Sequence, residues 1–239
     1  MALTELRSRQ VVPPQAFQAA EEVRVYGAVR EAAEHFAANR SGSFLLQELA
    51  GPFGRADFVL AFPDPLGLSA RQASGLRPLR VMTQARLVGA LSGRYAKTID
   101  EAAQQAGMTV ASANRTARQL AGSGHVSIAR DGRIRRHPAL VSVVTTAAYE
   151  AKVRDWQSGL RQARHYALWN RWSTLVLEVA RNRPDLMNQA RRHGVGVVVA
   201  GKRLAAARVQ RVPAYLQLMA SETVLDATDM LAERTGDLR

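Results

Sequence analysis

The sequence contains no cysteine, which excludes disulfide bonds and cysteine-ligated zinc and is typical of a protein in a reducing compartment. It also has no apolar run long enough to cross a membrane, because the run at 195–200 suits only a short buried strand. The N-terminal segment MALTELRSRQ lacks the apolar core of a signal peptide. These absences predict a cytoplasmic protein that does not enter a membrane.

Several catalytic motifs are missing as well. The five histidines show no metal-ligand spacing such as HExxH, and the sequence has neither a GxSxG motif nor a P-loop. Gly194-x-Gly196 follows a predicted helix and precedes a predicted strand, which is the wrong order for a dinucleotide-binding loop. The sequence therefore gives no support to a zinc hydrolase, a serine hydrolase, a dinucleotide-dependent enzyme or an ATP-driven activity.

Acidic residues are few relative to basic ones. The chain has 33 Lys and Arg against 20 Asp and Glu, for a formal net charge of +13. Most of this surplus lies between residues 66 and 138, where twelve Lys and Arg accompany three acids for a net charge of +9. Such a surplus predicts a polyanionic partner, most simply nucleic acid.

The basic stretch has the pattern of three helices followed by a hairpin. Residues 83–91 form the first predicted helix, and the capping box Thr98-Ile99-Asp100-Glu101 begins the second. Thr109 is placed to cap a third helix over 110–121, and Asp131-Gly132 predicts a two-residue hairpin turn. This order resembles a winged helix-turn-helix domain in which the hairpin is the wing.

The resemblance implies binding to double-stranded DNA, with the third helix in the major groove and the wing against the backbone or the minor groove. The residues expected to contact DNA are Ser112, Asn114, Arg115, Arg118 and Gln119 on the helix and Arg130, Arg133, Arg135 and Arg136 on the wing. The alternative is a winged helix that contacts protein, with basic residues that only keep its surface soluble. The concentration of positive charge favours DNA.

The segments on both sides of the basic stretch predict an α/β domain. Helical spacing extends over residues 15–39, and two β-prone runs joined by a Gly/Pro turn predict a hairpin. The predicted strands are 44–50, 55–62, 140–153, 173–179 and 195–200, and the later predicted helices are 155–170, 184–193 and 214–233. Two successive strand–helix–strand steps indicate a partly parallel sheet.

Glu150 and Lys152 lie two residues apart in a predicted strand, so their side chains share one face while Tyr149 and Ala151 share the other. An acid and a base at this spacing suit a metal-dependent phosphodiesterase, but taken alone they favour a solvated ion pair on a strand. Asp57, on the second strand of the upstream hairpin, is a third candidate for such a site.

The order of these elements resembles the PD-(D/E)XK nuclease superfamily, with its restriction-endonuclease-like fold, over residues 15–65 and 139–200. Asp57 and Glu150-Ala151-Lys152 carry the motif, and Gln162 and Tyr166 match the Gln-xxx-Tyr pattern of some members. Ala56 stands where a proline often precedes the Asp. The basic stretch also separates Asp57 from Glu150, so the resemblance requires their two strands to be neighbours.

The resemblance implies a site for Mg²⁺, with Mn²⁺ as a substitute, held by Asp57, Glu150 and the carbonyl group of Ala151. Lys152 would orient the attacking water or stabilise negative charge. Gln162 would position the lysine or the water, and Tyr166 would contact the backbone. Whether an additional acid joins the site stays open, and the candidates are Glu31, Glu34 and Glu48.

We therefore expect an α/β protein with a restriction-endonuclease-like mixed sheet flanked by helices, formed by residues 1–65 and 139–239, and a winged helix-turn-helix domain inserted at 66–138. The expected function is Mg²⁺-dependent endonucleolytic hydrolysis of DNA. The alternatives are a DNA-binding regulator or assembly factor with absent or partner-dependent catalysis, and a nuclease directed to RNA. Cutting of both strands would favour a homodimer. Protein partners in a larger complex are compatible with each of these functions.

Overall fold

The computed structural model describes residues 4–7, 18–228 and 230. By its internal contacts the chain divides into two units, each built from two separated segments. The sheet unit comprises Met1–Pro63 and Thr145–Val212, and the helical unit comprises Asp64–Val144 and Pro213–Arg239. Within the described ranges, no helix is both long and apolar enough to cross a membrane.

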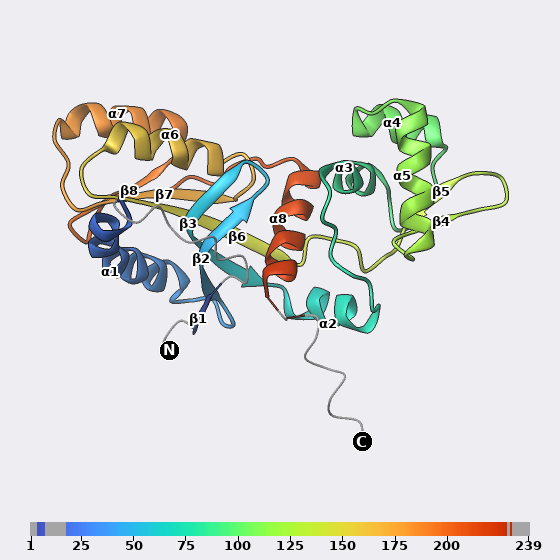
Figure 1. Cartoon of the computed structure of the whole chain (residues 1–239), viewed down its shortest axis with the longest axis horizontal. Coiled ribbons are helices and arrows are strands. Elements are labelled where there is room, and N and C mark those ends of the chain that lie inside the picture. Colours follow the sequence, from blue (N-terminus) through green and yellow to red (C-terminus); the bar gives the residue numbers. More distant parts are fainter. Residues whose placement is uncertain (1–3, 8–17, 229, 231–239) are drawn as a thin grey trace, which may run out of the picture. The chain divides into compact units, whose positions relative to one another are not determined.

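The sheet unit is built on a seven-stranded mixed sheet with the order β1-β2-β3-β6-β7-β8-β9 (Figure 1). Its strands are β1 (Thr4–Arg7), β2 (Phe44–Gly51), β3 (Gly54–Pro63), β6 (Val144–Lys152), β7 (Trp172–Leu177), β8 (Gly196–Val199) and β9 (Lys202–Ala205). β2 and β3 pair antiparallel, and β6, β7 and β8 run parallel to one another. The predicted hairpin and the partly parallel sheet are confirmed.

β3 and β6 are neighbours in the sheet although the long segment from Asp64 to Val143 separates them in the sequence. The resemblance to the nuclease superfamily required this adjacency. The insertion of the helical unit therefore leaves the sheet continuous, and it places Asp57 and Glu150 on adjacent strands.

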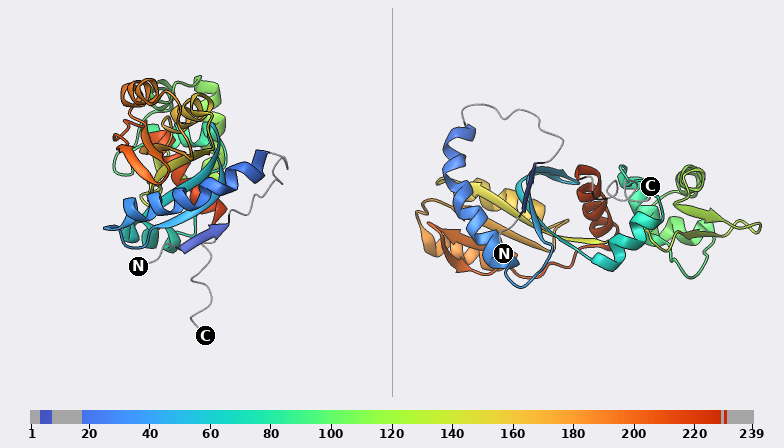
Figure 2. Two further views of the ribbon diagram at one scale, coloured as in Figure 1. Left: turned by 90° about the vertical axis from the view of Figure 1, so that its left-hand side faces the viewer. Right: turned by 90° about the horizontal axis from the view of Figure 1, so that it is seen from below.

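Helices cover both faces of this sheet (Figures 1 and 2). They are α1 (Gln18–Ala37) on one face and α6 (Trp156–Tyr166) and α7 (Arg183–His193) on the other. The apolar side of α1 shares a core cluster with Tyr149 and Ala151 of β6, whereas α6 and α7 share another with Leu175 and Leu177 of β7. Because side chains alternate along a strand, Glu150 and Lys152 both face the α6 side. The sequence predicts that they share one face, but not which helix covers it.

The helical unit combines the inserted segment with the last helix of the chain. Its elements are α2 (Pro65–Ala73), α3 (Met82–Ala90), α4 (Ile99–Ala106), α5 (Val110–Gly122), β4 (Val126–Ile128), β5 (Ile134–Arg136) and α8 (Ala214–Ala227). One apolar cluster joins Leu87 of α3, Leu120 of α5 and Leu218 of α8. The predicted capping box is present, since Thr98 N–H donates to Glu101 Oε2 at 2.8 Å and Glu101 N–H donates to Thr98 Oγ1 at 3.3 Å.

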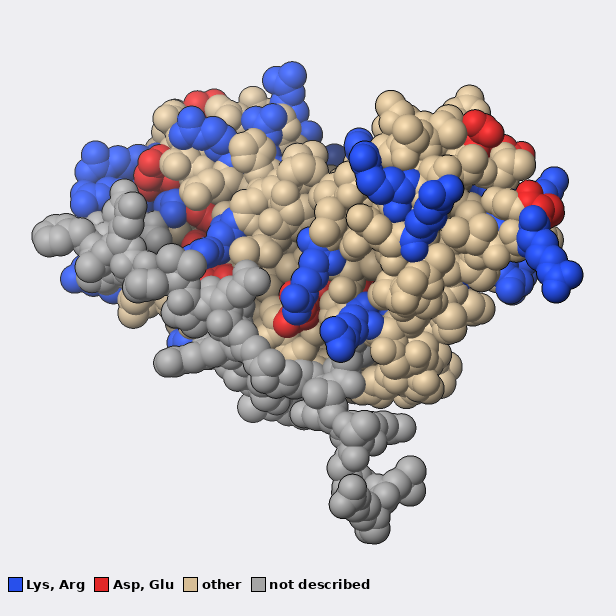
Figure 3. Space-filling model, turned by 45° about the vertical axis from the view of Figure 1, so that its right-hand side comes forward, with Lys and Arg blue, Asp and Glu red and all other residues tan. Residues whose placement is uncertain are grey.

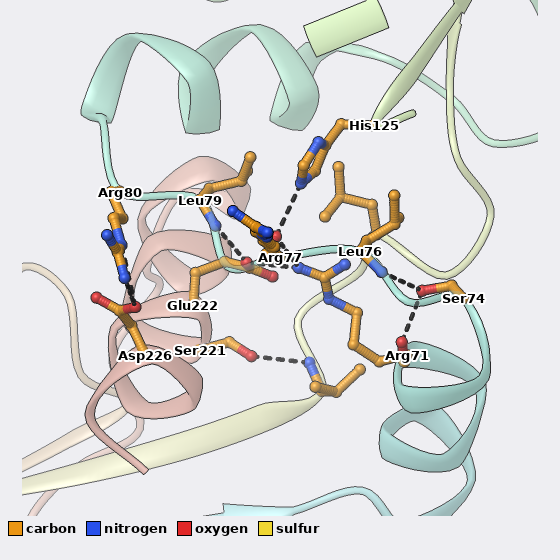
Figure 4. Close-up of polar contacts among 12 residues, drawn as sticks. Arg71, Ser74, Leu76, Arg77, Leu79, Arg80, His125, Ser221, Glu222 and Asp226 are labelled. Atoms are coloured by element: carbon orange, nitrogen blue, oxygen red, sulfur yellow. Dashed lines mark hydrogen bonds and ion pairs between the residues drawn. The ribbon is translucent and has the colours of Figure 1, made fainter. Parts of the chain in front are cut away.

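A buried ion pair connects α8 to α2 within this unit. The side chains of Arg71 and Glu222 are fully buried, and Arg71 NH2 lies 2.8 Å from Glu222 Oε2. The same carboxylate oxygen accepts a hydrogen bond of 2.7 Å from Leu79 N–H. Arg71 also donates to the Arg77 carbonyl oxygen at 3.0 Å, and His125 Nε2 lies 2.8 Å from that oxygen (Figure 4). The last helix is thus fixed by charge as well as by apolar packing.

Three elements differ from the sequence prediction. Residues 4–7, expected in a loose lead-in, form β1, which pairs parallel with β2. A strand of only four residues is too short for its alternation of polar and apolar side chains to be recognised in the sequence. The Pro63–Gly67 segment, expected only to end the hairpin, begins α2, where Asp64 caps the helix and Pro65 opens it. β9 was not predicted, and it pairs antiparallel with β8 after the turn at Gly201.

The last helix also differs in its packing. The sequence assigns residues 139–239 to the nuclease-like domain, whereas the contacts group α8 with the helical unit. α8 is buried on several sides, so its apolar pattern does not indicate which unit it joins. The described helix ends at Ala227, and the predicted end near residue 233 lies outside the described residues.

Candidate active site

Glu150 is fully buried in β6 and has two polar neighbours. Its Oε1 atom lies 2.9 Å from Lys152 Nζ. Its Oε2 atom lies 2.9 Å from the hydroxyl of Tyr166 on α6, and that hydroxyl lies 2.6 Å from the carbonyl oxygen of Arg55. β3, β6 and α6 therefore meet at the carboxyl group of Glu150.

The protonation of Glu150 is set by this environment. Burial, and after it repulsion from Asp57, raises the pKa of Glu150 to about 8, although Lys152 and Tyr166 oppose the rise. The single proton of the Tyr166 hydroxyl can satisfy only one of its two oxygen neighbours, so a protonated Glu150 can donate to Tyr166 while Tyr166 donates to Arg55. The charged form of Glu150 is thus unfavourable unless more positive charge enters the site.

Asp57 joins the site from the neighbouring strand β3. Its Oδ2 atom accepts a hydrogen bond of 2.7 Å from the backbone N–H of Ala151, the residue between Glu150 and Lys152. Asp57 is half-buried, so its carboxylate is partly exposed to solvent while Glu150 is not. The structure thus brings together the three residues of the sequence motif, and it fixes Asp57 against the strand that carries the other two.

Gln162 lies one helical turn before Tyr166, so both side chains are on the same side of α6. The Gln162 Oε1 atom is buried, and no donor among the described residues forms a hydrogen bond with it. A buried acceptor without a donor is expected where water or a ligand completes a site.

These residues fit a divalent cation. Mg²⁺ prefers oxygen ligands and often binds through one or two carboxylates together with substrate phosphate. Asp57 and Glu150 supply two carboxylates on adjacent strands, and a cation between them would favour the charged form of Glu150, whose pKa is raised first by burial and then by repulsion from Asp57.

Two of the three additional acids considered from the sequence lie on the other face of the sheet. Glu31 and Glu34 are exposed on α1, the helix on the opposite face of the sheet, where Glu31 lines a pocket with Tyr149. Glu48 of β2 has a φ of +53°, and its carboxylate lies 4.0 Å from the Arg55 guanidinium. Over the described ranges, no three acidic or histidine side chains gather as a metal cluster. The described contacts thus bring together the carboxyl groups of Asp57 and Glu150. Glu48 lies opposite Asp57 in the paired strand β2, and its participation stays a prediction.

Gly159 is a contributor that the sequence motif does not include. A Cβ atom at this position of α6 would lie 2.8 Å from Cγ of Lys152 and 2.6 Å from Cδ1 of Leu175. The missing side chain lets the helix pack directly on the stem of the lysine. The signal was present, because an isolated glycine inside a helical pattern often has a packing reason.

We expect Gly159→Ala to lower the free energy of unfolding by about 1–3 kcal/mol, because the new methyl group must displace Lys152 or Leu175. Urea unfolding followed by tryptophan fluorescence measures this, since all three tryptophans belong to the sheet unit. Gly27→Ala in α1 is the matched control, because nothing lies within 4 Å of its added Cβ. The control should be neutral or slightly stabilising. Equal losses in both variants would contradict close packing at Gly159.

Most of the residues expected to contact DNA are exposed in the helical unit. Asn114, Arg115, Arg118 and Gln119 are exposed on α5, and Ser112 is half-buried. The opposite side of α5 is buried in the core of the unit through Ala113, Ala117 and Leu120. α5 thus exposes the polar side that the sequence predicts, and Figure 3 shows basic side chains outnumbering acidic ones on the face in view.

The hairpin β4–β5 exposes three of its four predicted arginines. Arg130, Arg133 and Arg135 are exposed, but the loop between the paired residues Ile128 and Ile134 is longer than the predicted two-residue turn. The fourth, Arg136, is partly buried, and its guanidinium donates to the carbonyl oxygens of Leu91 and Leu140. Burial also lowers the pKa of Arg136. The Arg136 guanidinium therefore holds the hairpin to the end of α3 instead of pointing outward with the others.

In comparisons with known proteins, the chain matches no protein-family model, no curated protein and no solved structure.

Proposed function

We propose that this protein is a metal-dependent DNA endonuclease of the PD-(D/E)XK type. The observation that carries the proposal is the meeting of Asp57, Glu150 and Lys152 on one side of the sheet, from adjacent strands that are far apart in the sequence. A solvated surface ion pair does not account for a Glu150 that is fully buried beside a second carboxylate. Strongly perturbed acids of this kind are concentrated at functional sites.

Mg²⁺ or Mn²⁺, held by Asp57 and Glu150, would neutralise charge on the scissile phosphate and make a bound water more acidic. Lys152 would stabilise the negative charge that develops when water attacks phosphorus. Tyr166 holds the carboxyl group of Glu150 through its hydroxyl, and the Gln162 Oε1 atom offers an acceptor to a water. Attack forms one P–O bond and breaks another, so the strand is cut with transfer of a proton to the leaving oxygen.

The helical unit would act as an inserted winged helix-turn-helix domain that binds the duplex. Within it, α3, α4, α5 and the hairpin β4–β5 follow the order of such domains, and the outer side of α5 exposes polar and basic side chains. α5 would lie in the major groove, with Arg130, Arg133 and Arg135 of the hairpin near phosphates. Arg136 is omitted from this set because its guanidinium is bound to backbone carbonyl groups.

The test is incubation of supercoiled plasmid with the purified full chain and Mg²⁺ or Mn²⁺. We expect nicked or linear DNA, no product in EDTA, and no product from Glu150→Ala. Strong duplex binding without cleavage in any divalent metal would support the alternative of a DNA-binding factor whose catalysis is absent or partner-dependent. Preferred cleavage of RNA in competition with duplex DNA would support an RNA-directed nuclease.

We also expect Mg²⁺ or Mn²⁺ to raise the melting temperature of the wild-type protein, because a ligand at 100 times its Kd stabilises the fold by about 2.7 kcal/mol. Asp57→Asn should remove this shift. The control Asp185→Asn, at an exposed position of α7, should retain it. Thermal unfolding followed by tryptophan fluorescence provides the measurement, and a shift that persists in Asp57→Asn would place the cation elsewhere.

A further inference from the structure

A concave basic surface lies on the outer side of α6, away from Glu150. It is a pocket of about 360 Å³ between α6, the end of α7 and the segment around residue 210. Its polar lining contains cationic or neutral side chains and no acid, namely Arg161, Arg164, His165, His193 and Gln210. The proposed cleavage site does not use any of them.

The pocket is preformed by backbone contacts. Gln210 Nε2 donates to the carbonyl oxygens of Gly194 and Arg208 at 3.3 Å each, and Gln210 N–H donates to the Arg171 carbonyl oxygen at 2.9 Å. These bonds hold the segment around residue 210 against the end of α7. His193 lies at the end of α7, so it has the segment around residue 210 on one side and α6 on the other.

The pocket brings two arginines and two histidines together in one lining. In the described part of the chain, no carboxylate forms an ion pair with Arg161 or Arg164. Desolvation, followed by repulsion from Arg164 and Arg192, lowers the pKa of His193. Cations near helix C-termini are common because they interact with the helix dipole. This reason covers Arg164 and His165 in the last turn of α6, but not Arg161, which lies one turn earlier. It also does not explain the concave shape of the pocket.

We propose that this pocket binds a phosphate group of the nucleic-acid strand, and that it gives the sheet unit a contact with substrate of its own, independent of α5. The proposal rests on the proposed function, because it supplies a second contact for the same substrate. Two arginines provide planar N–H donors suited to phosphate oxygens, while the Gln210 amide donates to the carbonyl oxygens of Gly194 and Arg208 and shapes the pocket. The same helix turns Gln162 and Tyr166 toward the cleavage site and Arg161 and Arg164 toward the pocket, so one rigid element would position the strand for cutting.

The test measures binding of the full chain to a fluorescent duplex in EDTA across a series of salt concentrations, so that cleavage does not intervene. The pocket variant is Arg161→Ala/Arg164→Ala. The control, Arg24→Ala/Lys202→Ala, removes the same charge from exposed positions of the sheet unit outside the pocket. We expect the pocket variant to lose about tenfold in affinity. The slope of log K against log salt should become shallower by about 0.9, the value for one lost phosphate contact.

Each outcome decides a separate question. Equal losses on duplexes with and without 5′-phosphates would identify a backbone phosphate as the ligand, and a loss confined to 5′-phosphorylated duplexes would identify the strand end. Unchanged affinity and slope, or equal losses in the control, would overturn the proposal. A conservative control is Arg161→Lys/Arg164→Lys, which keeps both positive charges. Melting temperatures of all variants, measured in parallel, separate lost binding from lost folding. Binding is measured without metal, so it does not depend on cleavage. If the wild-type chain cuts no DNA but the pocket variant still shows the shallower salt slope, only the nuclease assignment is overturned and the phosphate pocket stands.

Discussion

The Lys152→Met protein should cut plasmid DNA at least ~100 times more slowly than wild type, the effect typical of removing one group that stabilises transition-state charge. Lys152 Nζ lies 2.9 Å from Glu150 Oε1, so the lysine places its charge beside a carboxyl group of the proposed metal site. Methionine keeps an unbranched stem to pack against Gly159 but carries no charge. Duplex affinity in EDTA should change little, because the basic surfaces remain intact.

Lys202→Met is the matched control, since Lys202 is exposed on β9 of the same unit. It should cut at the wild-type rate within a factor of about two. The measurement is the initial rate of plasmid nicking at saturating Mg²⁺, with melting temperatures compared in parallel. A Lys152→Met protein that is folded and cuts at a rate close to wild type would remove the lysine from the proposed mechanism.

Glu222→Gln should lower the free energy of unfolding of the helical unit by about 3–5 kcal/mol, because it leaves the buried charge of Arg71 without a counter-ion. Arg71 and Glu222 have fully buried side chains, and Arg71 NH2 lies 2.8 Å from Glu222 Oε2. Glutamine keeps an acceptor for Leu79 N–H, so the loss would report mainly on the uncompensated charge. The helical unit contains no tryptophan in its described part, so tryptophan fluorescence would not report on it directly. Unfolding is therefore followed by far-ultraviolet circular dichroism.

Two further variants identify the cause of that loss. Asp226→Asn removes the partner of Arg80 in a pair whose arginine side chain is 75% exposed, and it should cost less than about 1 kcal/mol. Arg71→Met/Glu222→Gln removes the buried charge altogether and should recover most of the loss. A double variant as unstable as Glu222→Gln alone would show that shape, rather than charge, holds this contact.

The sequence was sufficient to predict the elements around Glu150, because their patterns are local. Strand alternation placed Glu150 and Lys152 on one face, and the Gly/Pro turn before Asp57 identified the hairpin. The sequence could not show that β3 and β6 are neighbours, since no local pattern specifies which strands pair across a long insertion. It also could not give the hydrogen bond from Ala151 N–H to Asp57, which depends on that pairing.

Other features escaped prediction for different physical reasons. Arg136 has the same residue type and a similar sequence position to Arg135, yet only the fold shows that the Arg136 guanidinium binds the carbonyl oxygens of Leu91 and Leu140. The packing of α8 depended on long-range contacts, among them the pair formed by Arg71 and Glu222. The pocket at Arg161 and Arg164 joins three segments, and a sequence pattern along α6 reveals only one of them.

The position of α8 also has a consequence for biosynthesis. During translation the sheet unit has all of its segments once Val212 has left the ribosome, whereas residues 64–144 still lack the helix that supplies Leu218 and Glu222 to their core. Domains generally fold as units while the chain is being made. The half proposed to cleave DNA would therefore mature first, and the half proposed to hold DNA would mature only after α8 has been synthesised. Arg71 must wait for its counter-ion until then.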